Sequence, residues 1–530
     1  MPLLTLPSQI RGAFSTERNG VQETYAVAGN VVYSLRYTDG GWTYDEIGLL
    51  ETEDGEVRFM CYEGWILLLD GREFYTLTPQ QANVLQGYIP LYAKDLRTGS
   101  NVKITVYEPL NLLSYKIRLR YQLESRSDPI YFSDLHPELV EAVYLNGVKS
   151  DLWMVAEANR YLTVKDTSFS QGEVEVVVRL PESMIDRAAV TVSSEAVSIG
   201  QPHREQLLLY GKSIGTGCLW ISRTMDEAQR AATAYADANS CPLYITSEDT
   251  VTLGDGIQPI TGICHHYDRT LFFTANGVWM SNGEQDENGK LRILRINDTM
   301  GCSASGGLGV VGNSPISIFG RSILRWSSNT DEQNECNGQV ISLPVEAMFE
   351  ENFGVRRRIF ADIARREIWL YVPGASERIY LWLENQGGFC SFDGFSPQGL
   401  FMLGERVGFY VNEQLYVLDR NATYDTDASG QEKGIDSQYQ SYFFDLGDAR
   451  AIKHLHDVML LAQGDEQSVD LILQHVDGRE FSVPLNVSQD LLSPCHRRVS
   501  MGRFRFVRVG IRAKEKGTLR VRSLSLTGRA

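Results

Sequence analysis

The sequence lacks a long apolar run. No segment approaches the roughly 18 consecutive apolar residues that a membrane span needs. The N-terminal stretch MPLLTLPSQIRG also lacks the basic start and long apolar core of a secretion signal. Eight cysteines are scattered singly, without the C-x-x-C pair typical of zinc sites and redox dithiols. We therefore expect a chain that has no membrane span and is made in a cytoplasm, with reduced and mostly buried cysteines.

Catalytic motifs are also missing. The chain has no phosphate-binding G-x-x-x-x-G-K-[ST] loop and no G-x-S-x-G nucleophile elbow. Two histidine clusters, His265-His266 and His454-x-His456, lack a third metal ligand at a motif spacing. We predict no catalytic residue, no cofactor-binding residue and no metal ligand, and we expect that the chain is not an enzyme and needs no cofactor.

One acidic segment has the pattern of a calcium loop. Asp425, Asp427 and Ser429 are followed by a glycine, and Asp436 stands at the twelfth position. Flanking helices are absent, and a calcium loop prefers Glu at position twelve. A flexible linker is therefore the favoured interpretation, and calcium binding by Asp425, Asp427 and Asp436 stays open.

The charge of the chain is unevenly distributed. The net charge is -17, yet residues 495–530 hold eleven basic residues and one acid, Glu515. This tail indicates either an acidic protein partner or contact with nucleic acid at one end of the molecule. A simpler interpretation is that the alternating run RFRFVRVGIR exposes charged faces of edge strands to solvent.

Apolar hairpins recur along the chain. In LFFTANGVWM, residues 271–280, Asn276-Gly277 predicts a tight turn with positive φ at both central positions. Similar hairpins stand at residues 27–37, 65–77, 315–326, 366–383 and 407–418. Their period is roughly 40 residues where it is clearest, as repeated four-stranded blades require. Solenoids and paired β-sandwiches give similar hairpins, but we predict an all-β chain with a β-propeller of about six to eight blades.

Aromatic residues recur within these hairpins. A blade cannot bury its faces alone, so neighbouring blades must supply the core between them. We expect Trp279, Trp326, Trp369 and Trp382 to lie between blades.

Two segments interrupt the hairpin repeat. The strand-rich run from KITVYEPLNLLSYKIRLRYQL to EVEVVVRLP has the length of a small inserted β-sandwich, and a polar segment follows Asp419. The predicted domains are the first blades at 1–90, an inserted β-sandwich at 91–182, the remaining blades at 183–420, a linker at 421–435 and a C-terminal β-sandwich at 436–530. The one convincing helix begins at the capping box Thr224-Met-Asp-Glu227.

The order of segments from 206 to 328 resembles a known family. An I-T-G-I strand at 260–263 is followed by the hairpin at 271–280 and by a Gly-Cys turn at 301–302. This order is similar to that of propeller proteins of short-tailed bacteriophages, the tail nozzle, tail tubular protein B and packaged-DNA stabilisation proteins. The segments VYEPLNLLSYKIRLRYQL and IDSQYQSYFFDLGDARAIKHLH also resemble the family's inserted domain and its exit into a C-terminal sandwich.

This resemblance implies a structural virion protein, located in the tail and assembled in the host cytoplasm. It implies a ring of six copies that contacts the portal, the adaptor or other tail proteins. Double-stranded DNA would pass through the channel transiently, without specific binding. An acidic body fits that role because it repels phosphate. The basic C-terminal domain would then contact an acidic neighbour or another copy, so charge reversal at Arg503, Arg505 and Arg508 should weaken assembly more than folding.

Two other classes of function stay open. A propeller that binds or cleaves host-surface carbohydrate would need carboxylates that converge from several blades, and such a site has no spacing signature. The single turn YTDGGWTYDEIG is similar to the Asp-box turn of sialidase-type propellers, which supports the architecture and not the cleavage. A cytoplasmic scaffold would need an exposed peptide-binding face, for which the sequence has no marker.

Overall fold

The structure is a computed structural model of the 530-residue chain. It describes residues 2–38, 41–97, 105–132, 139–156, 161–187, 195–201, 204–211, 217–224, 241–284, 287, 290–328, 336–349, 353–375, 377–420, 422, 424–426, 432–465, 467–487, 493–514, 517 and 519–529. None of the helices in these ranges is long and apolar enough to cross a membrane.

Seven four-stranded antiparallel sheets form a β-propeller. Blade 1 is β2 to β5 (Ile10–Arg18, Val21–Ala28, Val31–Thr38, Gly41–Leu49), and blade 2 is β6 to β9 (Arg58–Tyr62, Trp65–Leu69, Phe74–Leu77, Ala82–Val84). Blade 3 is β18 to β21 (Glu195–Gln201, Arg204–Tyr210, Cys218–Ile221, Thr250–Thr252), and blade 4 is β22 to β25 (Ile260–His266, Arg269–Thr274, Gly277–Ser281, Leu294–Asn297). Blade 5 is β26 to β29 (Leu308–Val311, Ser314–Phe319, Ser322–Ser328, Cys336–Val340), and blade 6 is β30 to β33 (Arg358–Asp362, Glu367–Tyr371, Ile379–Leu383, Gly388–Phe392). Blade 7 combines β34 to β36 (Gly399–Leu403, Arg406–Val411, Gln414–Val417) with β1 (Pro2–Thr5).

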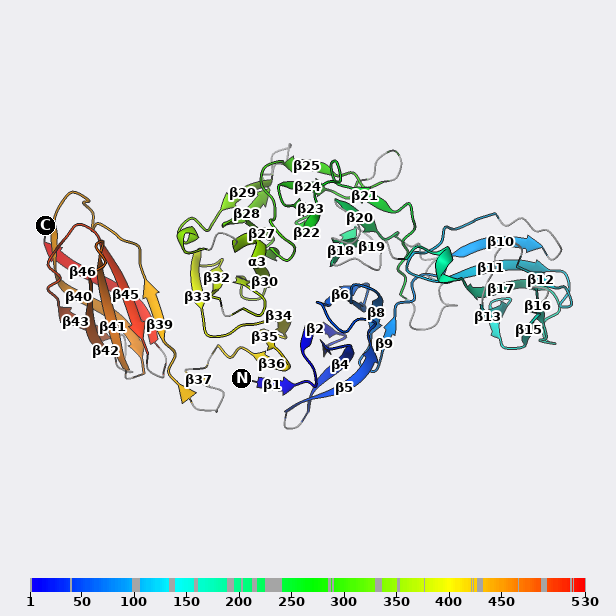
Figure 1. Ribbon diagram of the computed structural model, residues 1–530, viewed down its shortest axis with the longest axis horizontal. Helices are drawn as coiled ribbons and strands as arrows, with labels where there is room; N and C mark the ends of the chain where they lie inside the picture. The colour runs from blue at the N-terminus through cyan, green and yellow to red at the C-terminus, as the bar shows by residue number, and fades with distance from the viewer. Residues whose placement is uncertain are drawn as a thin grey trace. The chain divides into compact units, whose positions relative to one another are not determined.

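The ring is closed by strands from both ends of the propeller sequence. The innermost strands contact one another in turn from β2 through β6, β18, β22, β26, β30 and β34, and then back to β2 (Figure 1). The outermost strand of blade 7 is β1, which pairs antiparallel with β36. Closure therefore joins residues 2–5 to residues 414–416, so that blade 7 is complete only with both segments.

The predicted hairpins are the two middle strands of six blades. In β7–β8 and β31–β32 nearly every strand residue is buried, because a neighbouring blade covers each of the two faces. The middle pair of blade 3, β19–β20, was not predicted. Its strands are separated by the seven residues 211–217, a connection as long as the one between β31 and β32, but β20 has only four residues in which to show a strand pattern.

The four tryptophans occupy the predicted places between blades. Trp279 packs with residues of blades 3 and 4, and the ring of Trp326 lies 5.5 Å from that of Phe273 between blades 4 and 5. Trp382 and Trp369 fill the two following interfaces. The predicted all-β propeller is thereby confirmed, with seven blades.

The turn assigned to Asn276-Gly277 is wrong in detail. The two turn residues are Ala275 and Asn276, and neither Asn276 nor Gly277 has a positive φ. Gly277 is instead the first residue of β24, where an added Cβ would approach the Trp279 ring to 2.8 Å. Glycine is therefore needed for packing beneath Trp279 and not for the conformation of the turn.

An inserted β-sandwich lies between blades 2 and 3 in the sequence. A five-stranded sheet has the order β10-β11-β17-β13-β14, and a three-stranded sheet has the order β12-β16-β15. The strands are β10 (Leu91–Arg97), β11 (Lys116–Leu123), β12 (Ile130–Tyr131), β13 (Leu139–Leu145), β14 (Val148–Ser150), β15 (Trp153–Ala156), β16 (Tyr161–Val164) and β17 (Gly172–Arg179), followed by the 3-10 turn η2 (Glu182–Met184).

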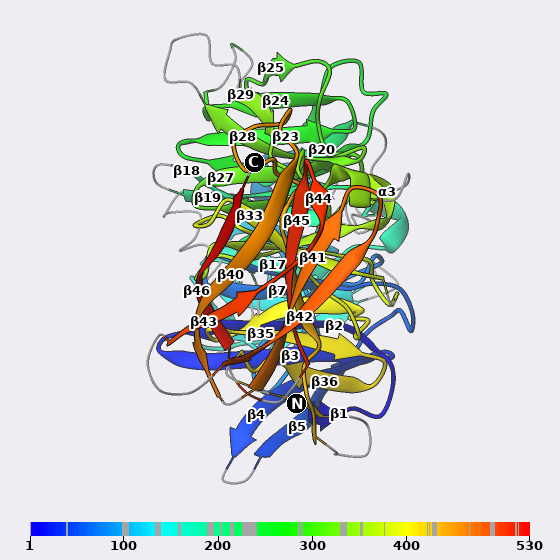
Figure 2. The ribbon, with the colours of Figure 1, turned by 90° about the vertical axis from the view of Figure 1, so that its left-hand side faces the viewer.

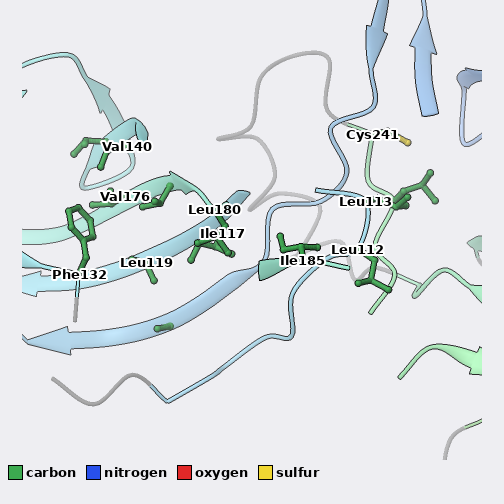
Figure 3. Close-up of a cluster of buried hydrophobic side chains, with 14 of the residues drawn as sticks. Leu112, Leu113, Ile117, Leu119, Phe132, Val140, Val176, Leu180, Ile185 and Cys241 are labelled. Atoms are coloured by element: carbon green, nitrogen blue, oxygen red, sulfur yellow. The ribbon is translucent and has the colours of Figure 1, made fainter. Parts of the chain in front are cut away.

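The core of the insert continues into the propeller. Figure 3 shows Phe132, Leu119 and Val176 inside the insert, and Leu113 beside Cys241 at the propeller end. Asn111 connects the two parts at this point, because its buried amide donates to the carbonyls of Tyr88 and Leu243 and accepts from two backbone amides. The insert is thus held to blades 2 and 3 by a shared apolar core and by polar contacts.

Residues 419–530 form a separate compact unit, a β-sandwich with its own core. One sheet has the order β39-β45-β41-β42, and the other has β40 between β43 with β44 on one side and β46 on the other (Figure 2). The strands are β39 (Ser437–Gln440), β40 (Lys453–Gly464), β41 (Gln467–His475), β42 (Glu480–Val487), β43 (Ser493–Arg498), β44 (Arg503–Phe504), β45 (Val507–Ala513) and β46 (Leu519–Arg529), preceded by the short hairpin β37 (Asp425–Thr426) and β38 (Glu432–Lys433).

Two smaller expectations need comment. The cysteines are less buried than predicted, since Cys61 is exposed and Cys218, Cys390 and Cys495 are half-buried, although none of the seven described in the structure is in a disulfide. The predicted helix after Thr224 lies outside the described residues. In the described part of the chain the helical elements are α3 (Phe353–Arg356) and the 3-10 turns η2 and η4 (Glu346–Met348).

Candidate functional site

The outer surface of one sheet of the C-terminal sandwich carries a concentration of basic side chains. We call this surface the basic face. It comprises seven exposed residues: Arg498, Arg503, Arg520, Arg529, His454, His456 and His496. On β40 the buried and exposed residues alternate, so that Val458 and Leu460 enter the core while their neighbours point outward.

Strand register brings these basic residues together from distant parts of the sequence. His454 lies opposite Arg503 of β44 on one side and opposite Arg529 of β46 on the other. Residues that are directly opposite in a sheet present their side chains on the same face, about 5 Å apart. Three basic side chains therefore form a row across three strands at one end of the face, and Arg520 stands opposite Gln463 at the other end.

The centre of the basic face is partly apolar. Met459, which is 38% exposed, lies between His496 and Ser525. In the next row Leu461 lies between Pro494 and Ser523. An apolar centre with a charged rim is the usual anatomy of a protein–protein interface.

Asp457 is the one acid among the outward-facing paired positions of this sheet. It stands opposite Arg498, and its Oδ1 lies 3.5 Å from Nε2 of His496. A register shift between Leu455 and Asp457 places His456 in a bulge, so that Asp457 faces outward although it follows His454 by three residues. The described residues contain no group of three potential metal ligands, so the His454 and His456 pair gains no third ligand from the fold.

The alternating run RFRFVRVGIR is two strands and not one. Arg503 belongs to β44 in one sheet, while Val507 begins β45 in the other sheet. Arg505 falls in the crossing between them. The interpretation as edge strands is wrong for β45, which lies between β39 and β41, and the chain changes sheets where Phe504 and Val507 both enter the core.

Arg508 and Arg512 consequently lie on a different surface from Arg503. The guanidinium of Arg508 stacks over the Phe443 ring at 4.3 Å. Arg512 donates two hydrogen bonds to Asp436, of 2.9 and 2.6 Å, and these bonds hold the pKa of that carboxyl below its ordinary value. The group of three arginines chosen from the sequence is therefore not one surface.

The predicted calcium loop is not assembled by the described residues. Asp436 is engaged by Arg512, as described above. Asp427 and Ser429 lie outside the described residues, and Asp425 begins the short strand β37. Calcium binding by Asp425, Asp427 and Asp436 stays a prediction.

A pocket with several polar side chains in its lining opens where the innermost strands of the propeller begin. Its volume is about 490 Å³. Gln9 precedes β2, Glu53 and Asp54 precede β6, and Gln398 precedes β34, so three blades contribute loops to one wall. Such a volume is within the usual range for small-ligand sites. The sequence did not point to this pocket, since its residues are separated by up to several hundred positions.

A buried arginine builds the acidic side of this pocket. We call residues 50–57, which connect β5 to β6, the acidic loop. Arg11 is 8% exposed and donates to the carbonyls of Gly55, Gly29, Thr52 and Asp54 and to the Thr52 hydroxyl, at 2.6 to 2.8 Å. Burial lowers the pKa of Arg11, and the nearby Asp54 carboxylate opposes that shift. All five N–H groups of the guanidinium are used, which fixes the backbone of the loop.

An ion pair connects opposite parts of the ring at the pocket. Glu56 of the acidic loop pairs with Arg358 at the start of β30 in blade 6, and also with Arg58 at 2.9 Å. The buried Tyr371 and Tyr410 lie nearby, and burial raises the pKa of both phenols. Glu56 is thus occupied by arginines, whereas the exposed side chains of Glu51 and Glu53 are directed to solvent.

The other histidine cluster has a structural role. His266 is buried, and its Nδ1 lies 2.7 Å from the carbonyl oxygen of Asn313. Burial lowers the pKa of His266. His265 is exposed on the adjacent position of β22, so the two rings point to opposite faces of the sheet and do not form a metal site together.

Comparison with known proteins gives matches among solved structures alone. No family model and no curated protein matches the chain. PorZ, a bacterial surface component of the type-IX secretion system of Porphyromonas gingivalis, is 11% identical with a TM-score of 0.38, over 91% of this chain and 46% of that chain. Sqt1 of Saccharomyces cerevisiae is 8% identical with a TM-score of 0.34, over 79% of this chain and 100% of that chain. These low values carry no argument about function, and this chain spans about half of the PorZ chain.

Glycoside hydrolases also occur among the similar structures. An exo-β-1,3-galactanase from Phanerochaete chrysosporium is 9% identical with a TM-score of 0.24, over 63% of this chain and 95% of that chain. The expectation that the chain is not an enzyme must therefore be corrected, because proteins that resemble this one include enzymes. A missing sequence motif was a poor reason to exclude catalysis, since in a propeller catalytic groups can converge from several blades without any sequence spacing.

Proposed function

We propose that the chain is a structural protein of a bacteriophage tail, a nozzle or adaptor that forms part of the wall of the DNA ejection channel and helps to retain packaged DNA. The segment order at 206–328 that resembles tail nozzle proteins is one support. The observation that carries the proposal is the separation of charge. Residues 1–418 hold 52 acidic and 34 basic side chains, whereas four arginines and three histidines of the sandwich lie together on its basic face.

This separation suits a channel wall because two different contacts are required. DNA must slide without being held, and an acidic body repels phosphate through the same Coulomb interaction by which basic proteins bind it. Neighbouring proteins must be held firmly, and a basic face with an apolar centre can bind an acidic protein surface. The partners under this proposal are other copies in a ring of six and the adjoining tail proteins.

The protein composition of purified phage particles tests the proposal. Phage particles from the source culture are purified on a density gradient, and their peptides are identified by mass spectrometry. The proposal predicts this chain among the virion proteins, at a copy number close to that of other ring-forming tail proteins. Particles that carry the other tail proteins but lack this chain would contradict it.

A second candidate is carbohydrate binding at the propeller pocket. The specific observation is a pocket of about 490 Å³ with the carboxylates of Glu53 and Asp54 and the amides of Gln9 and Gln398 at its wall. Carboxylates and amides accept and donate the hydrogen bonds that sugar hydroxyls require. A glycan array tests this candidate, with Glu53→Gln as the variant that should lose binding and Glu17→Gln, an exposed change in blade 1, as the control.

A further inference from the structure

We propose that the basic face of one copy docks on the acidic loop of a second copy of the chain. This inference deepens the assembly role proposed above and rests on it, but it names the two surfaces that meet. The first surface is the row of Arg503, His454 and Arg529, together with Arg498 and Arg520 around the apolar centre.

The composition of the basic face favours a protein over nucleic acid. Its middle rows contain Met459, Leu461 and Pro494, which a phosphate backbone would leave unused. An acid, Asp457, stands in the row of Arg498, where it would repel phosphate. A protein partner can cover the apolar centre and place carboxylates against the basic rows at either end.

The acidic loop is a suitable counterpart within the same sequence. Glu51, Glu53 and Asp54 are exposed and lie within four residues. Arg11 donates four hydrogen bonds to the loop, three of them to backbone carbonyls, so little conformational freedom would be lost when the loop is bound. Arg358 and Arg58 neutralise Glu56 and leave the other carboxylates available.

The two surfaces are different, so the contact between copies is heterologous. Each copy offers both a basic face and an acidic loop, and each contact leaves one of each free for the next copy. Repetition of such a contact produces either a closed ring or an open filament. The same pairing of unlike surfaces can therefore build an assembly of many copies from a single kind of chain.

The experiment measures self-association of the purified full-length chain by sedimentation velocity, at about 50 mM and about 500 mM salt. The face variant carries Arg498→Glu, Arg503→Glu and Arg529→Glu, and the loop variant carries Glu51→Lys and Glu53→Lys. The control is Arg479→Glu, an exposed arginine of the same sandwich at the β41–β42 turn, away from the basic face. Urea unfolding verifies that all variants fold.

We expect the wild-type chain and the control to associate at low salt, and each charge-reversed variant alone to associate at least about tenfold more weakly. Mixing the face variant with the loop variant should restore association, because the intact basic face of one then meets the intact acidic loop of the other. A monomeric wild-type chain, equal weakening by the control, or no recovery on mixing would overturn the inference. Binding of a DNA duplex through the basic face, with association unchanged in the face variant, would also overturn it.

A failure of this experiment can be distinguished from a failure of the proposed function. The virion proposal depends on the presence of the chain in particles, whereas the docking inference depends on the purified chain alone. If the chain is found in particles but neither charge-reversed variant changes its self-association, the tail role is supported and the docking contact is rejected.

Discussion

The conformation of the acidic loop at the propeller pocket depends on the side chain of Arg11. Arg11→Lys keeps the charge but replaces a five-donor planar group by a single ammonium, so most of the bonds to the acidic loop are lost. We expect a loss of about 3 kcal/mol in the free energy of unfolding, measured by urea titration. Arg18→Lys, on the same strand and in a partly exposed pair with Glu23, is the control and should cost less than about 1 kcal/mol. Equal losses in the two variants would show that the buried hydrogen bonds to the loop contribute no more to stability than a partly exposed ion pair.

His266 makes the stability of blade 4 depend on pH. Burial lowers its pKa below the ordinary value of 6.5, and the Arg269 charge lowers it further. The unfolded chain therefore takes up a proton as the pH falls below 6.5, while the folded chain does not until a lower pH. Stability from this residue is complete above pH 6.5 and is lost as the pH falls below it. Urea midpoints between pH 8 and pH 5 should fall more steeply for the wild type than for His266→Gln, and parallel curves would refute this account.

Some residues could be predicted from the sequence and others could not. The four tryptophans were placed correctly because an aromatic residue in an alternating strand must be covered, and in a propeller the neighbouring blade does so. Arg11 gave no signal, because its partners come from loops that only the fold brings near. Gly277 gave a misleading signal, since Asn-Gly is typical of a turn and here the glycine makes room for a ring.

At the scale of elements, the junction of the insert with the propeller depends on Asn111. Its side chain uses both donors and both acceptor sites on buried backbone groups, including the carbonyls of Tyr88 and Leu243. Asn111→Leu keeps the number and branching of the heavy atoms but leaves those groups unsatisfied, and should lower the free energy of unfolding by at least about 3 kcal/mol. Asn83→Leu in β9, where a half-buried amide donates to the side chain of the exposed Gln81, is the control, with an expected change under about 1 kcal/mol. A small effect of Asn111→Leu in urea unfolding would mean that the insert is held by its apolar core alone.

Elements were predictable where both strands of a hairpin were long enough to show a pattern. Six middle hairpins follow from such patterns, including β31–β32 across the seven residues 372–378, whereas β19–β20 was missed because β20 has only four residues. The split of RFRFVRVGIR into β44 and β45 could not be read from alternation, since both halves keep the same period. The basic face could not be predicted either, because the register between β40, β43, β44 and β46 is what brings its residues together.

At the scale of the whole molecule, closure of the ring depends on the four residues of β1. Deletion of residues 2–5 removes the outer strand of blade 7 and the half-buried Leu3 and Leu4. We expect the propeller to lose about 3 kcal/mol of stability and the sandwich, which has its own core, to lose none. Calorimetry should show one transition shifted to lower temperature and a second one unchanged. A common shift of both transitions would contradict the independence of the two units.

The architecture as a whole was the most predictable level. A period near 40 residues, a strand-rich interruption and a polar segment together indicated a propeller, an insert and a C-terminal sandwich, and the structure confirms this fold class. The number of blades could not be fixed in advance, because one blade lacks a tight hairpin and another is completed by a strand from the start of the chain. Function was the least predictable level, since no residue pattern marks either a channel wall or a pocket built from separate loops.

Immunogold electron microscopy of a lysate of the source culture tests the central claim, that the chain is part of a phage tail, most directly. Antibody raised against the purified chain is applied to intact particles and to free material on the same grid. The account predicts gold at the tail, at one vertex of each particle. Gold on free material alone, with particles unlabelled, would contradict the tail role and would favour carbohydrate binding at the propeller pocket.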